Sequence, residues 1–465
     1  MEAARSGDIV AALVLEPRTL AALGKNRRRA AYYCAAVAAL ARDLEARGAR
    51  LIVRRGESKR AILRLAKEVG ASAVTWSVRY DGGAQQAASA LQSALEEAGL
   101  RATPVHDAPA VPPDETAAAR SVDGGRGYRA LTPYLAAWSA LAREPHTAAL
   151  RFAQVTAPSD SLPSPDECPS TSSGQAPTTN SGQAPTEPSE GAVLAGFDAY
   201  LAGPILGYRT ARNVPGDGPT SRLSEALSFG VVSARTILRR VDERKRDPFL
   251  LAEEKVALDS FTKALARRDF FLQLAWFFED SPDAALQPRM RSFPFARSHP
   301  ALEAWREGRT GFPLVDAGMR QLRETGWMHP RVRSVAASFL CFDLGVDWRV
   351  GRDTFDRYLV EDDAALATGN WQWAAAVGAD LAQFPRIYNP RKQARSFDPR
   401  GAYVRRWIPE LAQLPDADLF DAVAPGRRPQ LALPLFGDTA YPAPVLDHEK
   451  AAREFLARYA TFERG

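Results

Sequence analysis

Segments typical of strands and helices alternate over the first hundred residues. Residues 8–15 are a run of apolar residues typical of a buried strand, and residues 26–47 repeat apolar side chains at helical spacing. The alternation continues with strands over 50–54, 73–77 and 101–106 and helices over 58–68 and 84–98. This rhythm predicts an α/β domain with a parallel, doubly wound sheet and helices on both faces. No GxGxxG motif follows any of these strands, so a dinucleotide fingerprint is absent.

The composition changes abruptly near residue 155. Pro, Ser, Thr, Gly and Gln then dominate, and SGQAPT occurs at 173–178 and again at 181–186. Such low complexity without apolar periodicity predicts disorder, with Cys168 exposed in it. From Phe197 onward the pattern is helical almost throughout. The 465 residues exceed what one core holds. We therefore predict three parts: an α/β domain over 1–150, a disordered linker over 151–191 and an all-helical domain over 192–465.

Composition excludes several classes of protein. Hydrophobic residues make up 46% of the chain and charged residues 25%, as in a globular protein. No apolar run reaches the roughly 18–20 residues that cross a bilayer, and the start lacks the apolar core of a secretion signal. The three cysteines and five histidines show no metal-ligand spacing, so no metal is predicted. We expect a monomer in a reducing cytoplasm, and a net charge of +5 permits a nucleic-acid partner.

Tryptophan and arginine are concentrated between Arg309 and Leu411, most densely in GNWQWAAAVGAD at Gly369–Asp380. TGWMHPRVR, DWRVG and RIYNPRKQARSFDPRGAYVRRWIPEL belong to the same stretch. Seven of the nine tryptophans follow residue 190. Large aromatics beside cations mark a site more often than they mark ordinary core. This ordered series resembles the flavin-binding domain of the DNA photolyase/cryptochrome family over most of residues 192–412.

The resemblance implies a helical domain that holds FAD without a covalent bond, behind an α/β domain that often carries a light-harvesting chromophore. The sequence matches the family from its second strand onward, and the family's opening strand is missing. The loss of this interior strand would leave a gap in the sheet, unless the given start is too late or another segment fills the slot. This argues against a second, antenna chromophore. By resemblance, the cofactor is held by Tyr208, Thr220, Ser221, Arg222, Leu223, Ser224, Phe261, Arg268, Trp327, Arg333, Glu361, Asp363 and Ala367.

The segment TSRLS at Thr220–Ser224 has the residue types of a helix N-terminus that could bind an anion. Hydroxyl residues before an apolar-periodic segment mark a helix N-terminus, which binds anions, and Arg222 has a guanidinium suited to phosphate. From the residues alone it is only a helix cap; in the family it grips the FAD diphosphate. Likewise a carboxylate–guanidinium pair is chemically sensible in an apolar pocket, and by resemblance Glu361 can pair with Arg333.

Several positions depart from the family's pattern for repair of cyclobutane dimers. Arg267 stands where a tryptophan usually stacks on the flipped bases, and Ala264 stands where a glutamate is usual. Pro330 and Ser334 also replace residues that often contact the dimer. Ala367 replaces an Asn or Asp that faces the flavin. These changes leave open whether repair is retained.

Two tryptophans of the dense segment have distinct implied roles. Trp371 and Trp373 are two residues apart, so on a helix they point in nearly opposite directions. By resemblance, Trp371 and Trp348 carry electrons to the flavin and Trp373 stacks on the lesion. Phe295 takes the place of the third, surface-proximal member and is much harder to oxidise; Trp305 is the nearest alternative.

Basic residues interleaved with aromatics follow Arg386 and suit a surface that tracks phosphates. A solvated basic face is equally consistent with composition, and the family's DNA groove favours DNA. The residues expected to contact DNA are Arg267, Arg331, Trp373, Arg386, Lys392 and Arg395. On a helix Trp327 and Arg331 would share a face. The leading function is a blue-light DNA photolyase acting on pyrimidine dimers; the alternatives are a cryptochrome-like photoreceptor and a degenerate flavoprotein.

Overall fold

The computed structural model describes residues 8–118, 127–141, 151–168, 187–216, 220–278, 280–379, 385–420 and 441–464. Contacts divide the chain into two compact units. Unit 1 comprises residues 1–206, 221–282 and 360–366, and unit 2 comprises 207–220, 283–359 and 367–465. These two units are discontinuous in sequence and divide the chain differently from the three predicted parts. The predicted domain limits stay a prediction.

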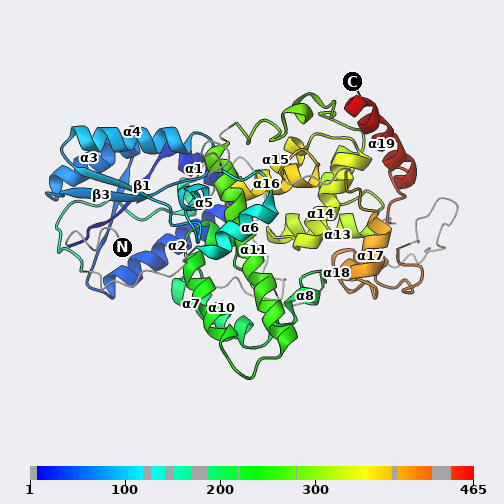
Figure 1. The fold of residues 1–465 in the computed structure, drawn as a ribbon, viewed down its shortest axis with the longest axis horizontal. Coiled ribbons are helices and arrows are strands. Elements are labelled where there is room, and N and C mark those ends of the chain that lie inside the picture. The colour runs from blue at the N-terminus through cyan, green and yellow to red at the C-terminus, as the bar shows by residue number, and fades with distance from the viewer. Residues whose placement is uncertain are drawn as a thin grey trace. The chain divides into compact units, whose positions relative to one another are not determined.

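The strands of unit 1 pair in parallel, as the alternation predicts. Ala11 of β1 lies opposite Leu51 of β2, and Ala73 of β3 lies opposite Arg101 of β4. Within the described part of the chain these are two separate two-stranded sheets. Figure 1 shows the strands between α4 on one side and α2 on the other. The elements are β1 (Ala11–Leu15), α1 (Pro17–Gly24), α2 (Arg27–Glu45), β2 (Leu51–Arg55), α3 (Ser58–Glu68), β3 (Ala73–Ser77), α4 (Ala84–Glu97), β4 (Arg101–Val105), α5 (Pro113–Ala118) and α6 (Leu131–Ala140).

Residues 151–168 correct the prediction of disorder for that part of the linker. Phe152 forms a bridge with Ile9, and the amide of Asp160 donates to the carbonyl of Val53 over 3.0 Å. Backbone groups beside the strand pair β1–β2 are thereby satisfied, which a low-complexity composition does not reveal. Cys168 is buried, not exposed as predicted, because it packs with Leu23 and Ala30. Residues 187–191 also correct it, because α7 begins at Glu190 and Ser189 caps this helix by accepting from the amide of Ala192. Residues 169–186 of the predicted linker lie outside the described residues.

Helices make up the described regular structure after residue 187. Unit 1 adds α7 (Glu190–Ala202), α9 (Ser224–Ser228), α10 (Ala234–Lys245) and the 26-residue α11 (Ala252–Phe277). Unit 2 contains α8 (Tyr208–Ala211), α12 (Leu302–Glu307), α13 (Pro313–Thr325), α14 (Pro330–Ser338), α15 (Trp348–Asp356), α17 (Pro390–Phe397), α18 (Ala402–Trp407) and α19 (His448–Arg464). Helix α16 (Ala364–Ala374) begins in unit 1 and continues in unit 2. The core of unit 2 is built around fully buried aromatics, including Trp305, Phe312 and Phe339.

Candidate functional site

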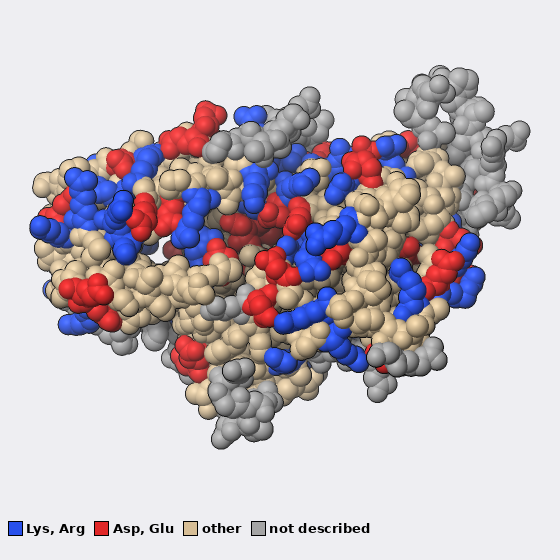
Figure 2. Space-filling model, turned by 90° about the horizontal axis from the view of Figure 1, so that it is seen from above, with Lys and Arg blue, Asp and Glu red and all other residues tan. Residues whose placement is uncertain are grey.

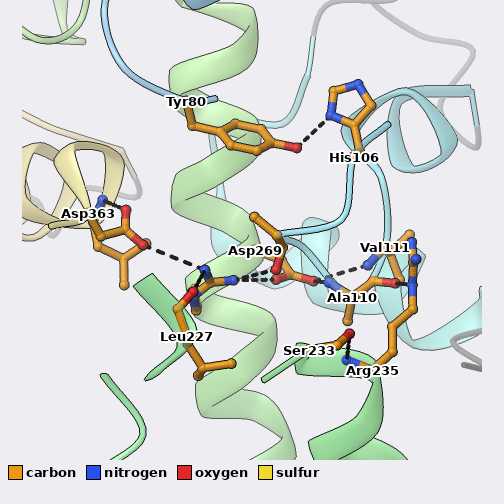
Figure 3. A network of polar contacts seen from close by, with 12 residues as sticks. Tyr80, His106, Ala110, Val111, Leu227, Ser233, Arg235, Asp269 and Asp363 are labelled. Atoms are coloured by element: carbon orange, nitrogen blue, oxygen red, sulfur yellow. Dashed lines mark hydrogen bonds and ion pairs between the residues drawn. The ribbon is translucent and has the colours of Figure 1, made fainter. Parts of the chain in front are cut away.

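A buried arginine on α11 connects three segments of unit 1. The guanidinium of Arg268 donates to the carbonyl of Ala108 over 2.7 Å and to that of Leu227 over 3.3 Å. It also lies 3.7 Å from the carboxylate of Asp363, and only 8% and 12% of the two side chains are exposed. Burial raises the pKa of Asp363, and the charge of Arg268 opposes that rise. In Figure 3 a dashed line runs from Asp363 toward the helix that carries Asp269. Each charge therefore needs the other to remain buried.

The next residue, Asp269, gathers contacts that the sequence did not indicate. One carboxylate oxygen accepts from the amides of Ala110 and Val111 at 2.8 and 3.2 Å (Figure 3), and from the indole Nε1 of Trp138 at 2.9 Å. Burial raises its pKa to about 6, against the charge of Arg268 and these hydrogen bonds. Its partners are more than a hundred residues away in sequence, so no local pattern points to it. Arg268 and Asp269 together fix α11 against the loop after β4.

The segment TSRLS has an exposed, polar backbone turn. Arg222 is exposed and has φ of +50°, a left-handed conformation that residues other than glycine rarely adopt. Leu223 is buried and anchors the turn, while Ser224 is exposed at the start of α9. Strained backbone of this kind is often kept at binding sites. The hydroxyls and the guanidinium are donors of the kind that a pyrophosphate accepts.

The segment around Trp327 in unit 2 corrects one prediction. Helix α14 begins at Pro330, because Pro is favoured at the first helical position and His329 caps the helix by accepting from the amide of Arg331. Trp327 therefore precedes the helix and does not share a helical face with Arg331. The guanidinium of Arg331 donates to Asn213 over 2.5 Å and lies 4.6 Å above the ring of Phe397.

Neighbouring groups in this segment are polar and buried. Arg333 donates through Nε to the carbonyl of Met328 over 2.8 Å. His329 is buried, and its Nε2 has no hydrogen-bond partner among the described residues. Burial, followed by the charges of Arg333 and Arg331, lowers the pKa of His329 to about 4. The imidazole is thus neutral at pH 7. Glu361 belongs to unit 1 and Arg333 to unit 2, so their pairing stays a prediction.

Helix α16 separates its two tryptophans as predicted. Trp371 is buried and Trp373 has 38% of its surface exposed. The ring of Trp371 contacts Phe355 edge-on with 4.9 Å between ring centroids and Trp305 with 6.4 Å. Trp371 therefore lies in an aromatic cluster of unit 2, and of these neighbours the sequence pointed only to Trp305.

Trp348 and Phe295 have quite different surroundings. Trp348 is buried, and the guanidinium carbons of Arg349 and Arg352 each lie 5.3 Å from its ring centroid. Two nearby positive charges disfavour a further positive charge on this ring. Phe295 packs against Phe293 and Phe455, with centroids 4.7 and 6.2 Å away. It is part of an apolar aromatic cluster that holds α19.

The remaining predicted residues have mixed environments. Tyr208 is partly exposed beneath the guanidinium of Arg212, and Phe261 is buried against Phe197 and Tyr200. Partly exposed positions are Thr220, Ser221, Arg267 and Ala367. The predicted DNA contacts Arg386, Lys392 and Arg395 are exposed on and just before α17. On the face shown in Figure 2, Lys and Arg side chains are mixed with Asp and Glu.

These residues fit the chemistry of FAD. The hydroxyls of Thr220, Ser221 and Ser224, which are partly or fully exposed, and Arg222 suit its anionic pyrophosphate. Within unit 1 the strained backbone at Arg222, and within unit 2 the orphaned buried Nε2 of His329, are each a feature of the kind that contact with a polar ligand explains. No group of three or more His, Cys, Asp and Glu among the described residues is arranged to hold a metal ion. Within the same residues, no helix has the length and apolar character needed to span a bilayer.

Comparison with known proteins agrees with this assignment. Residues 261–461 match the family described as the FAD binding domain of DNA photolyase, and residues 1–153 match the family described as DNA photolyase. The chain is 31% identical to the deoxyribodipyrimidine photo-lyase of a Synechococcus strain, over 98% of this chain and 92% of that protein.

Solved structures give the same result. A bacterial class III photolyase from Agrobacterium tumefaciens superposes with a TM-score of 0.83 at 30% identity, covering 99% of this chain and 93% of its own. A cryptochrome from Synechocystis superposes with a TM-score of 0.82 at 25% identity, covering 99% and 94%. The chain therefore belongs to the DNA photolyase/cryptochrome family and carries that family's FAD-binding domain.

Proposed function

We propose that this protein is a DNA photolyase that uses blue light and reduced FAD to split pyrimidine dimers. The proposal is supported by relatives that are 31–33% identical to this chain over more than nine-tenths of its length. Each of these relatives is named deoxyribodipyrimidine photo-lyase. The observation on this chain that carries the proposal is the opposite orientation of Trp371 and Trp373 on α16. Trp371 is buried in the protein interior, and Trp373 is exposed, so that a base can stack on it.

Each residue has a task in this proposal. Trp373 offers an exposed ring on which a flipped base can stack. Arg386, Lys392 and Arg395 contact phosphates of the strand, with Arg267 and Arg331 nearer the lesion. Trp371 passes electrons toward the cofactor, with Trp348 behind it and Phe295 in the third position. Bound FAD, once reduced and excited by light, supplies the electron that splits the dimer.

The residues proposed to hold FAD position it and balance its charges. Arg222 and the hydroxyls of Thr220, Ser221 and Ser224 bind the pyrophosphate. The pair Arg268–Asp363 presents a fixed, buried charge distribution. The remaining contacts are assigned to Tyr208, Leu223, Phe261, Trp327, Arg333, Glu361 and Ala367.

A repair assay tests this function directly. Single-stranded oligonucleotides that contain one cyclobutane dimer are illuminated with blue light in the presence of the FAD-loaded, dithionite-reduced protein. We expect the dimer to be lost only in the light. Chromatography of the oligonucleotide measures this loss. Unchanged dimer in the light, with fully reduced FAD bound, contradicts the proposal.

The second candidate function is a photoreceptor without repair activity. The residues Ala264, Arg267 and Ser334 favour it, because each replaces a usual lesion contact, and a cryptochrome is among the similar structures. This candidate predicts FAD binding without dimer loss, together with a light-dependent structural change. Limited proteolysis in darkness and in blue light measures that change.

We also propose that the strand pairs β1–β2 and β3–β4 are parts of one doubly wound sheet. Both pairs are parallel, and helices separate successive strands in the chain. The predicted lack of an opening strand and the identity of any antenna chromophore stay predictions.

A further inference from the structure

A tyrosine hydrogen-bonded to a histidine, with a carboxylate on the far side of the imidazole, forms a row of polar groups in unit 1 that the proposed function does not use. The hydroxyl of Tyr80 lies 2.5 Å from Nδ1 of His106 (Figure 3), and Nε2 of that imidazole lies 3.6 Å from the carboxylate of Asp114. Tyr80 is buried, whereas 13% of the His106 side chain and 66% of the Asp114 side chain are exposed. The chain of groups thus leads from the interior to water.

The partners of His106 decide which of its nitrogens can accept a proton. A hydrogen bond from His106 is the first cause that holds the pKa of Asp114 below its ordinary value. A neutral imidazole that donates from Nε2 has its lone pair on Nδ1, which faces the Tyr80 hydroxyl. Burial raises the pKa of Tyr80, so the phenol keeps its proton at rest. His106 is therefore placed as the base for that proton.

An indole lies against both rings. The ring of Trp276 is 4.6 Å from that of His106, edge-on, and 6.0 Å from that of Tyr80. Tyrosine and tryptophan are side chains that can be oxidised by one electron, and here they are in contact. His106 beside them can take up the proton that tyrosine releases on oxidation.

This cluster is continuous with the pair Arg268–Asp363. Trp276 lies eight residues after Arg268 on α11, a little over two turns along the same helix. Ala108, whose carbonyl accepts from Arg268, packs in one apolar cluster with Tyr80, Trp276 and Leu366. All of these residues belong to unit 1. The oxidisable rings therefore pack beside residues proposed to hold FAD.

We propose that Tyr80 is an electron donor to photo-excited, oxidised FAD, with His106 as the acceptor of its proton. The inference rests on the proposed binding of FAD. One electron passes from the phenol to the flavin through the indole of Trp276, and the O–H proton moves to Nδ1 of His106. The products on the protein are a neutral phenoxyl radical and an imidazolium whose charge faces Asp114. This route complements the tryptophans of unit 2, where Phe295 is hard to oxidise and two guanidiniums flank Trp348.

Tyr134 provides a matched control within the same unit. It is fully buried, and its ring lies 5.2 Å from that of Phe270 on α11. Its hydroxyl has no hydrogen-bond partner among the described residues. It therefore has the same phenol and a similar burial without a base to take the proton.

The test uses the full chain loaded with oxidised FAD and excited by a blue flash without added reductant. Transient absorption and electron paramagnetic resonance detect the tyrosyl radical. We expect this radical in the wild type and in Tyr134→Phe, its loss in Tyr80→Phe and in His106→Gln, and slower formation in D2O than in H2O. Flavin absorbance checks that each variant holds FAD. If Tyr80→Phe does not hold FAD, the comparison of His106→Gln with the wild type tests the inference.

Two outcomes overturn the inference: a wild type that forms no tyrosyl radical, and a radical that persists in both Tyr80→Phe and His106→Gln. The proposed function is judged separately, from dimer loss by the wild type reduced with dithionite, a state that needs no donor from the protein. If the protein forms the radical but does not repair the dimer, the inference holds and the proposed function is wrong. If it repairs the dimer but forms no radical, the proposed function holds and the inference is wrong.

Discussion

Trp371 packs so closely on Gly351 that a Cβ at Gly351 would lie 2.2 Å from Cη2 of the indole. Gly351 is on α15 between Trp348 and Phe355, three and four residues away, so the three residues share one face of that helix. The missing side chain leaves the space that the ring of Trp371 occupies. Gly351 thus leaves room for the ring of Trp371 on the face of α15 that also carries Trp348.

Gly351→Ala is expected to destabilise the protein by overpacking this contact. Added methyl groups in a well-packed core cost about 1–3 kcal/mol, and the contacted atoms belong to a rigid ring and to Leu340. Urea unfolding followed by tryptophan fluorescence measures the lower free energy of unfolding. Gly196→Ala on α7 is the control, because a Cβ there meets no heavy atom within 4 Å. Equal stability of the two variants would contradict the observed packing.

Arg268→Ala is expected to lower the free energy of unfolding far more than the loss of a surface charge does. The substitution leaves the carboxylates of Asp363 and Asp269 buried without their guanidinium, and the carbonyls of Ala108 and Leu227 without a donor. Removing one partner of a buried ion pair costs about 3–5 kcal/mol. The same urea experiment with Arg400→Ala, an exposed arginine, gives the reference. A loss below about 1 kcal/mol, the usual limit for an exposed pair, would show that Arg268 is not the partner of these carboxylates.

The stability of the protein should fall as the pH rises through the range in which Asp269 ionises. Its pKa in the folded protein is about 6, against an ordinary value of 3.8. Between these values the folded state binds the proton more tightly than the unfolded chain does, so the free energy of unfolding decreases from about pH 4 to pH 6. One pKa unit corresponds to about 1.4 kcal/mol, so the decrease approaches 3 kcal/mol.

Asp269→Asn provides the comparison for this pH dependence. The amide stays neutral while its oxygen can still accept from Ala110, Val111 and Trp138. The difference in unfolding free energy between the variant and the wild type should therefore change across pH 4–6 and be constant above it. Parallel curves for the two proteins over this range would mean that Asp269 titrates normally.

Local patterns predicted the secondary structure of unit 1 well. The strand over 73–77 and the helix over 58–68 occur at the predicted residues. These elements bury a repeating set of side chains, and that period is written in the sequence. Helix α1 was missed because its eight residues follow β1 after a single residue. The burial of Cys168 was missed because its partners Leu23 and Ala30 are more than 130 residues earlier in the chain.

The candidate site was predictable only where residue type itself carries the chemistry. The separation of Trp371 from Trp373 follows from helical geometry. The contacts of Asp269, and the chain from Tyr80 through His106 to Asp114, connect segments far apart in sequence. No spacing rule brings such residues together, since the fold determines their distance.

Trp373→Ala is expected to weaken binding of dimer-containing DNA. The exposed ring on α16 can stack on one base, and a stacked base contributes about 1–3 kcal/mol, or roughly a 5- to 150-fold change in Kd. Fluorescence anisotropy of a labelled single strand with one dimer, in darkness, measures binding without repair. Leu456→Ala removes a similarly exposed apolar side chain from α19 and should leave Kd unchanged. If Trp373→Ala also leaves Kd unchanged while FAD content is preserved, the lesion is not held by this ring, and the photoreceptor becomes the better supported function.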